Sequence, residues 1–326
     1  MKRYGTANLA AVAMVLAGLQ SSAAWAQGSA AKIDRISIGT GAIGGIYHVL
    51  GGGMAKLLRE KLDGVDVTAE TTNASVDNMR LVGTKQAEVG FGTSVAIVQG
   101  VKGDGPFKGV KYPVAGLMNI YPQYLWVITV DGTGITTLAD LKGKRVSTSN
   151  PGSGSELDAV NILKAANLGL TDIKRERLPP QQAADALKDR RIDALIHTAG
   201  QRQPAWEDIA NTPGTKIKFL DTSSAVPSLQ KEWGEAVYFG LTLPKATYKG
   251  QDAEVPMAGG GNALFVREDL PEDLVYRITK IILENLDELA KVHPEVRNIK
   301  LETAANTPVP LHPGAARYFK EKGLVK

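Results

Sequence analysis

Cysteine is absent from this chain of 326 residues. Without a thiolate the chain cannot form disulfides, use a thiol nucleophile, or hold a zinc finger or an iron–sulfur cluster. Histidine is also scarce, with four scattered residues, and the sequence contains neither an HExxH nor a GxSxG motif. These absences favour a protein with no metal site, no cofactor and no catalytic residues.

A strong excess of one charge and a long apolar run are missing as well. The 38 basic and 34 acidic side chains give a formal net charge of +4, which indicates no nucleic-acid partner. The most specific local pattern lies at the start of the chain, where Lys2 and Arg3 precede an apolar run at 9–19 and the small residues Ala24 and Ala26. This run covers about half of a ~30 Å membrane core, so residues 1–26 are interpreted as a cleaved signal peptide and not as an anchor. We therefore expect a periplasmic protein that does not span the membrane and begins at Gln27, with a net charge of +2.

Strands and helices alternate along the rest of the chain. Expected strands are 33–40, 65–71, 89–92 and 114–118 in a first unit, and 124–130, 146, 174–178 and 192–198 in a second. Expected helices are 75–85, 94–101, 155–166, 181–188, 204–211 and 314–322, with one long helix over 269–291 that Asp269 caps. The stretch that ends near Glu254 is rich in Pro, Gly and Thr and is expected to be irregular. The pattern predicts an α/β fold with parallel sheets covered on both faces.

Two glycine-rich turns each follow a strand and precede a helix. The first, 39–44, reads GTGAIG, and the second, 150–156, reads NPGSGSE. Strand carboxyl ends and helix N-termini face the cleft in α/β proteins, and helix N–H groups favour an anion there. One such turn in each half is what a ligand held between two lobes requires.

Other functions remain open from these residues. The first turn is a literal GxGxxG, and Glu70 follows where a ribose-binding acid would sit, which would suit a dinucleotide-binding enzyme. Ser153 or Ser155 could be the nucleophile of a secreted hydrolase, although no base is nearby in sequence. Ser155 could equally be only a helix N-cap.

Five segments, in order, resemble the TAXI-type solute-binding proteins of tripartite ATP-independent periplasmic (TRAP) transporters. The segments are 38–53 (IGTGAIGGIYHVLGGG), 72–81 (TNASVDNMRL), 138–155 (LADLKGKRVSTSNPGSGS), 246–256 (ATYKGQDAEVP) and 269–289. The resemblance implies a two-lobed periplasmic-binding-protein fold, type II-like, with a hinge between the lobes. Lobe I would comprise 27–120 and 258–326, and lobe II 121–257.

The resemblance also implies the function and the site. The protein would be a monomeric receptor, not an enzyme, that binds a small carboxylate such as glutamate, 2-oxoglutarate or another short organic acid and delivers it to TRAP membrane permease subunits. The site residues carried over are Gly41, Gly44, Gly45, Tyr47, Thr72, Asn73, Ser75, Thr93, Ser94, Gly152, Ser153, Gly154 and Ser155. A receptor of the same fold that serves an ABC transporter or a sensor kinase is the alternative.

Three positions depart from the family pattern. Ala42 and Ile43 stand where small hydroxyl residues are common, and His48 stands where an aromatic is common. We expect these changes to shrink and dry one corner of the pocket, so that the ligand is less polar at one end than glutamate. Arg202 is the best candidate for a bidentate partner of its carboxylate, and an ordinary surface arginine is the alternative.

Overall fold

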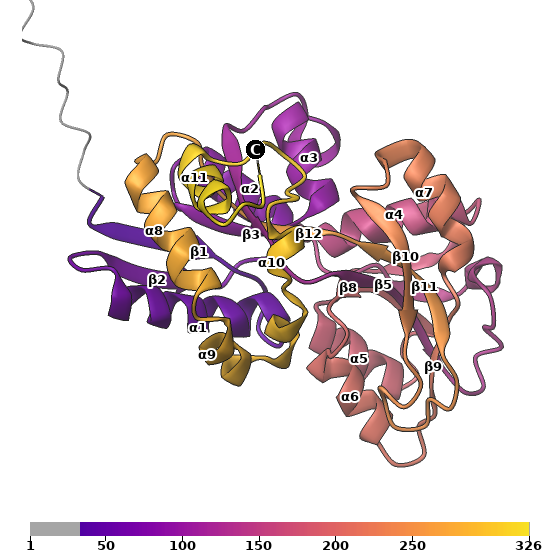
Figure 1. The fold of residues 1–326 in the computed structure, drawn as a ribbon. Coiled ribbons are helices and arrows are strands. Elements are labelled where there is room, and N and C mark those ends of the chain that lie inside the picture. The colour runs from indigo at the N-terminus through magenta and orange to yellow at the C-terminus, as the bar shows by residue number, and fades with distance from the viewer. Residues whose placement is uncertain (1–32, 326) are drawn as a thin grey trace, which may run out of the picture. The chain divides into compact units, whose positions relative to one another are not determined.

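The computed structural model describes residues 33–325, and Asp34–Lys326 form one compact unit. The predicted signal peptide, residues 1–26, lies outside the described residues. Two β-sheets, each flanked by helices, make up the two lobes of this unit (Figure 1). In the part of the chain that is described, no helix combines the length and apolar character that a membrane span requires.

The first sheet has the strand order β2-β1-β3-β12-β4. Its strands are β1 (Arg35–Gly39), β2 (Asp66–Glu70), β3 (Val89–Thr93), β4 (Val114–Asn119) and β12 (Asn262–Arg267). The helices of this lobe are α1 (Ile46–Lys61), α2 (Ser75–Gly83), α3 (Ser94–Lys102), α8 (Glu272–Leu283), α9 (Leu286–Val292), α10 (Leu301–Ala304) and α11 (Pro313–Glu321). Each of the three N-terminal helices therefore follows a strand of the same sheet.

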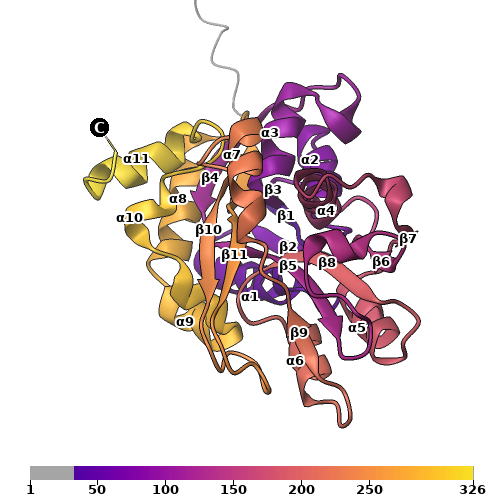
Figure 2. The ribbon, with the colours of Figure 1, turned by 90° about the vertical axis from the view of Figure 1, so that its right-hand side faces the viewer.

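The second sheet has the order β10-β11-β5-β8-β6-β7, with β9 paired to β5. Its strands are β5 (Gln123–Val130), β6 (Arg145–Ser147), β7 (Lys174–Glu176), β8 (Ala194–Ala199), β9 (Ile217–Phe219), β10 (Tyr238–Leu243) and β11 (Val255–Gly260). Its helices are α4 (Gly154–Ala165), α5 (Pro180–Lys188), α6 (Pro204–Asn211) and α7 (Val226–Trp233). Figure 2 shows β10 and β11 side by side at one edge of this sheet.

The chain passes between the sheets at two neighbouring places. It leaves the first sheet after Asn119 and enters the second at Gln123, and it returns between Gly260 and Asn262. The two passages are hydrogen-bonded to each other, because Ile120 N–H donates to the carbonyl of Asn262 at 3.0 Å. The predicted fold class, the two-lobed α/β fold of the periplasmic binding type, is confirmed.

Each sheet buries an apolar core against its helices. In the first lobe, Ile36 and Ile38 of β1 and Leu50 and Met54 of α1 are fully buried. The core of the second lobe joins β5, β6 and β8 to α4 and α7, and it includes Val95 from α3 of the first lobe. Apolar packing therefore continues from one lobe into the other at the start of α3.

The prediction of parallel sheets is wrong, because both sheets are mixed. In the first, β12 runs antiparallel to β3 and β4, and in the second, β5 runs antiparallel to β8 and β11. Parallel pairing is confined to β1 with β2 and β3, and β6 with β7 and β8. The physical reason is that β5 and β12 enter their sheets directly from the other lobe, without the helical crossover that parallel neighbours require.

The predicted long helix over 269–291 is two helices, α8 and α9. The break lies at Asn285, whose side-chain amide donates to the carbonyl of Ile281 at 2.7 Å and competes with the backbone ladder. Helix α8 begins after Pro271, and Asp269 does not cap it. The Asp269 carboxylate instead pairs with Arg267 and Lys85, which hold its pKa well below the usual range.

The stretch expected to be irregular up to Glu254 contains regular elements. Strand β9, helix α7 and strand β10 all lie within it. The sequence analysis took the proline and glycine residues of this stretch as signs of irregular structure and therefore missed α7. Pro227 near its start and Gly234 after its end are in fact the pattern of a short capped helix. Strand β10 is buried at Tyr238 and Leu243 and less buried between them, as is typical of a strand at the edge of a sheet.

Candidate functional site

One cavity of about 50 Å³ lies between the two sheets, where strands end and helices begin. The turn after β1, the start of α2 and the end of β3 line it from the first lobe, while the start of α4 and the end of β8 line it from the second. The lining residues are Gly41, Ala42, Gly45, Ile46, Tyr47, Ala74, Ser75, Thr93, Tyr121, Gln123, Asn150, Ser153, Gly154, Ser155, Pro180, His197, Thr198, Ala199 and Gln203. Both glycine-rich turns found in the sequence thus face the same space.

The structure brings eight of the predicted site residues together in this cavity. They are Gly41, Gly45, Tyr47, Ser75, Thr93, Ser153, Gly154 and Ser155. Six others, Gly44, Thr72, Asn73, Ser94, Gly152 and Arg202, do not line it.

Several of these six residues shape or hold the backbone segments around the cavity without lining it. The Thr72 hydroxyl donates to Asn78 Oδ1 at 2.7 Å and accepts from Ala74 N–H, which shapes the turn before α2. Ser94 N–H donates to the carbonyl of Gly261 at 2.8 Å and so ties α3 to the chain's return passage. Gly44, at φ +84°, occupies a left-handed backbone position that favours glycine.

Arg202 does not reach the cavity, so the structure gives it no place as the carboxylate partner. Its guanidinium pairs with Glu207 at 3.1 Å and is half exposed. Its backbone N–H donates to Glu295 Oε1 at 3.1 Å, which connects the loop after β8 to the segment Pro294–Asn298. Arg202 therefore contributes to the scaffold beside the site.

The structure places Ile43 and His48 outside the lining of the cavity. Ile43 is 73% exposed and does not line the cavity, because the turn directs its side chain to solvent. His48 lies in the first turn of α1, where its Nδ1 is 3.3 Å from Thr71 Oγ1. Of the three departures from the family pattern, only Ala42 lines the cavity.

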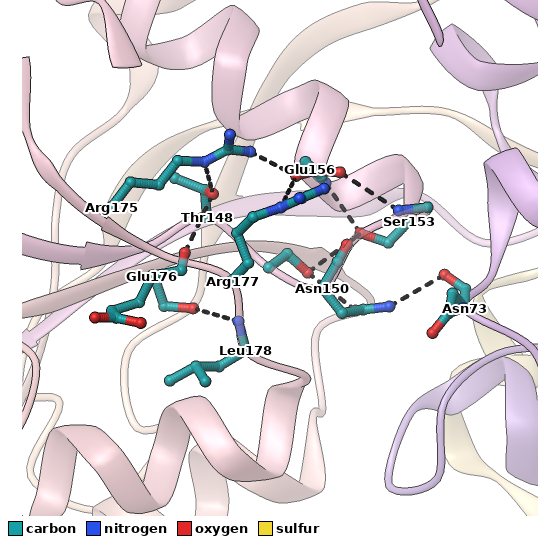
Figure 3. A network of polar contacts seen from close by, with 12 residues as sticks. Asn73, Thr148, Asn150, Ser153, Glu156, Arg175, Glu176, Arg177 and Leu178 are labelled. Carbon is teal, nitrogen blue, oxygen red and sulfur yellow. Dashed lines mark hydrogen bonds and ion pairs between the residues drawn. The ribbon is translucent and has the colours of Figure 1, made fainter. Parts of the chain in front are cut away.

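The second glycine-rich turn is held in place by local capping and by an ion-pair cluster (Figure 3). Ser149 at φ +69° and Gly152 at φ +81° take left-handed conformations that turn the chain from β6 into α4. Ser153, not Ser155, is the N-cap: its hydroxyl oxygen accepts from Glu156 N–H at 3.1 Å. Glu156 is the centre of the cluster and pairs with Arg175 and Arg177.

Hydrogen bonds cross between the lobes at the rim of the cavity. The N–H groups of Val76 and Asp77, in the first turn of α2, donate to the carbonyl of Gly152 at 3.0 and 3.3 Å. Asn150 Nδ2 donates to the carbonyl of Asn73 at 3.2 Å (Figure 3). Backbone groups of one lobe are therefore satisfied by the other lobe in this conformation.

Glycine is required at Gly154, where α4 closely approaches the first lobe. A Cβ on Gly154 would lie 2.6 Å from Ser75 Oγ and 2.7 Å from Thr93 Cγ2. Such distances are below any real Cβ contact, and the neighbours are short side chains with little room to move. The approach of α4 to the first lobe thus depends on a missing side chain.

The serines near the cavity lack the geometry of a nucleophile. The Ser153 hydroxyl donates to the carbonyl of Asn150 at 2.7 Å, and the Ser155 hydroxyl donates to the carbonyl of Thr198 at 3.1 Å. The serine paired with a histidine is Ser149, whose Oγ is 2.9 Å from His197 Nδ1. Burial lowers the pKa of His197 to about 3, so the ring is neutral and a weak base.

The dinucleotide interpretation of the first turn also fails on geometry. The space at this turn measures about 50 Å³, a third of the ~150 Å³ cavity that accommodates benzene. Glu70, the proposed ribose-binding acid, accepts a hydrogen bond from Ser37 Oγ at 2.5 Å and does not line the cavity. In residues 33–325, no group of three His, Asp or Glu is placed to hold a metal ion.

Sequence reasoning missed several residues that line the cavity. They are Ala74, Tyr121, Gln123, Asn150, Pro180, His197, Thr198, Ala199 and Gln203, together with Ile46. Tyr121 and Gln123 lie at the passage between the sheets, whose position depends on tertiary structure. His197 and Thr198 end β8, so the rule that strand ends face the cleft would have found them.

A buried carboxyl group lies behind the cavity wall. Asp158 of α4 accepts a hydrogen bond from the Tyr238 hydroxyl at 2.5 Å, and Asn161 Nδ2 donates to the same hydroxyl at 2.9 Å. Burial raises the pKa of Asp158 to about 6, although hydrogen bonds from Tyr238 and Thr198 oppose this shift. Burial is the main cause of the raised pKa of Tyr47, and the charge of Asp158 adds to it, so the field of Asp158 reaches the cavity.

Comparison with known proteins shows the family. Residues 38–323 match the model of the NMT1-like family, so the chain belongs to this family. A protein of known structure from Bordetella bronchiseptica RB50 is 18% identical over 90% of each chain, with a TM-score of 0.53. The periplasmic aliphatic sulphonate binding protein SsuA from Escherichia coli is 16% identical over 90% of this chain and 89% of that one, with a TM-score of 0.47. An ancestral arginine-binding protein bound to arginine is 17% identical over 80% of this chain and 97% of that one, with a TM-score of 0.47. At these identities the likeness concerns the fold alone.

Proposed function

We propose that this chain is a periplasmic solute receptor of a TRAP transporter that binds a small carboxylate between its lobes and delivers it to membrane permease subunits. Candidate ligands are glutamate, 2-oxoglutarate and other short organic acids. Lobe I is 27–120 with 261–326 and lobe II is 121–260, three residues longer than the sequence indicated, because β11 pairs within the second sheet. The passages near 119–122 and 260–262 form the hinge. Membership of the NMT1-like family and the resemblance of five segments to TAXI-type receptors support this proposal.

The observation that carries the proposal is the cavity at the start of α4, which is lined from both lobes and by both glycine-rich turns. A receptor must bury its ligand against two bodies that can separate, and Thr93 of one lobe lies next to Gly154 of the other at this cavity. The start of α4, at Gly154 and Ser155, offers N–H groups that suit a carboxylate.

Binding is coupled to closure through contacts that exist only when the lobes are together. The hydrogen bonds from Val76 and Asp77 to Gly152, and from Asn150 to Asn73, are lost when the lobes separate and water replaces them. Because their net contribution is small, the free protein can open, and a bridging ligand shifts the population to the closed form. The closed form is the one that the permease recognises.

A receptor of this kind needs no chemistry of its own. The hydroxyls of Ser153 and Ser155 are both engaged with backbone groups, and His197 is a weak base. Fluorophosphonate labelling provides the direct check: a receptor remains unlabelled, and a covalent adduct on either serine would support the hydrolase alternative.

The first experiment is a thermal-shift panel on chain 27–326, unfolded and refolded to remove any co-purified ligand. The panel contains C3 to C6 mono- and dicarboxylates, amino acids, sulfonates, sugars and nicotinamide nucleotides. A ligand at 100 times its Kd stabilises the fold by ~2.7 kcal/mol, which raises the Tm by several degrees. Small-angle scattering with the best ligand should show a smaller radius of gyration, and equal profiles would contradict closure.

A transport assay separates the TRAP proposal from its alternative. The receptor is added to proteoliposomes that hold the permease encoded beside it, and uptake of the radiolabelled ligand is measured. Uptake driven by a sodium gradient without ATP supports the TRAP assignment. A requirement for ATP would identify an ABC system instead.

A further inference from the structure

Four side chains that line the cavity have buried polar atoms without a hydrogen-bond partner. They are Thr93 Oγ1, Tyr121 OH, Gln123 Oε1 and both polar atoms of the Gln203 amide. These are five of the twelve buried, unpartnered side-chain atoms found in residues 33–325. Buried polar groups are nearly always paired, so their concentration around one cavity points to a ligand that pairs with them.

One end of the cavity is suited to a carboxylate. Helix α4 begins at Gly154, and the first N–H groups of a helix have no partner within it. The unpartnered Thr93 hydroxyl borders Gly154 from the other lobe, next to Ser75. Backbone N–H groups and a hydroxyl donor thus converge from both lobes on one point.

The rest of the cavity is neutral. The Tyr121 hydroxyl and the Gln203 amide can donate, and the amide oxygens of Gln123 and Gln203 can accept. Burial raises the pKa of Tyr47 and Tyr121 and lowers that of His197 to about 3, so all three rings are uncharged at neutral pH.

The 19 residues in 33–325 that line the cavity are all neutral, and none of these 19 is Asp, Glu, Lys or Arg. A second carboxylate on the ligand would need a cation at the neutral end, and an ammonium group would need a carboxylate there. Neither is present among the lining side chains. The cavity therefore matches a ligand with one negative charge and no positive charge.

The size of the cavity limits the ligand further. About 50 Å³ is a third of the ~150 Å³ that accommodates the six carbons of benzene. A ligand with the length of glutamate would hold the lobes further apart than they are in this conformation.

We propose that the solute is a short monocarboxylate of about two to four carbons whose other polar groups are neutral hydroxyl, oxo or amide groups. Its carboxylate binds the N–H groups of Gly154 and Ser155 and the Thr93 hydroxyl, and its neutral group pairs with Tyr121 and Gln203. This inference rests on the proposed receptor function and narrows its ligand class.

Isothermal titration calorimetry on refolded chain 27–326 with four matched probes tests the inference. Lactate carries one carboxylate and one hydroxyl, malate adds a second carboxylate, alanine replaces the hydroxyl by an ammonium, and lactamide removes the charge. Glycolate, pyruvate and 2-hydroxybutyrate extend the monocarboxylate series, and 2-oxoglutarate and glutamate extend the other. The best monocarboxylate should bind at least 100-fold more tightly than malate, alanine, lactamide, 2-oxoglutarate or glutamate.

Two substitutions test the assigned contacts separately. Thr93→Val removes the donor to the carboxylate, and Gln203→Leu removes the pairing at the neutral end; each should weaken monocarboxylate binding by about 10- to 100-fold. Gln203→Leu should not lower the Tm of the ligand-free protein, because the amide has no partner to lose. Gln182→Leu, on the exposed face of α5, is the matched control and should bind like the parent.

The outcomes distinguish this inference from the proposed function. If malate, 2-oxoglutarate or glutamate binds as tightly as the best monocarboxylate, the monocarboxylate inference is wrong and the carboxylate receptor stands. If none of the acids binds, or if lactamide binds as well as lactate, both the inference and the carboxylate assignment are wrong. Parental affinity in both Thr93→Val and Gln203→Leu would also overturn the assigned contacts.

Discussion

The substitution Gly154→Ala should separate closure from stability. Gly154 lies in the first turn of α4, where its backbone is helical and needs no left-handed conformation. Alanine has a higher helix propensity than glycine, so the open form should be unchanged or stabilised by up to ~1 kcal/mol. The closed form, in contrast, must accommodate the new methyl group between the lobes.

The cost of that methyl group follows from the distances around Gly154. The new Cβ would lie 2.6 Å from Ser75 Oγ and 2.7 Å from Thr93 Cγ2, and it would also overlap Thr93 Oγ1. Rotation of Thr93 exchanges one close atom for the other, so the side chain cannot move away from the methyl group. Inserting a methyl into such a contact costs about 1–3 kcal/mol, which corresponds to a ~5- to 150-fold loss of ligand affinity.

The assay combines calorimetry with small-angle scattering, using the tightest carboxylate of the panel. Gly154→Ala should bind more weakly, keep its ligand-free Tm, and show less contraction at a given ligand concentration. The control is Gly52→Ala in α1, because a Cβ there meets no atom within 4 Å and should leave affinity unchanged. Parental affinity and contraction in Gly154→Ala would refute the close approach of the lobes as the closed state.

Three further predictions concern single side chains. Burial raises the folded-state pKa of Asp158 from 3.8 to about 6, so the free energy of unfolding of the parent, relative to Asp158→Asn, should fall by up to about 3 kcal/mol as the pH rises from 4 to above 6. Urea unfolding of both proteins at pH 4.5 and 7.5 measures this difference. Parallel pH profiles of the two proteins would contradict the prediction. The negative charge of Asp158 reaches the cavity and is lost when the carboxyl group is protonated, so the parent should bind carboxylates more tightly at pH 5.5 than at pH 7.5. Asp158→Asn should not show this difference. Calorimetry on both proteins checks it, and an equal pH dependence would count against the prediction. Arg202→Ala should bind carboxylates like the parent, since the guanidinium pairs with Glu207 outside the cavity; a tenfold loss of affinity in titration would reinstate Arg202 in the site.

Local rules in the sequence predict the parts of the site that one segment can form alone. The turns at 39–44 and 150–156 combine glycines, a preceding strand and a following helix, and eight residues carried over from the family pattern do line one cavity. The same rules left Ser155 open as a cap of α4, whereas the cap is Ser153: both serines are suitable types, and only the backbone path selects Ser153. They also placed Ile43 inward, although the turn directs it to solvent.

The sequence by itself determined the alternation of strands and helices, the two anion-compatible turns and the lack of thiol chemistry, because each depends on residue type and short spacing. Tertiary structure alone decided the mixed pairing of β5 and β12, which follows from the two passages between the sheets. It also decided that Tyr121, Gln123 and Gln203 face the turn at Gly154, and that Arg202 does not. These residues are brought together or kept apart by long-range packing, which no local pattern in the chain encodes.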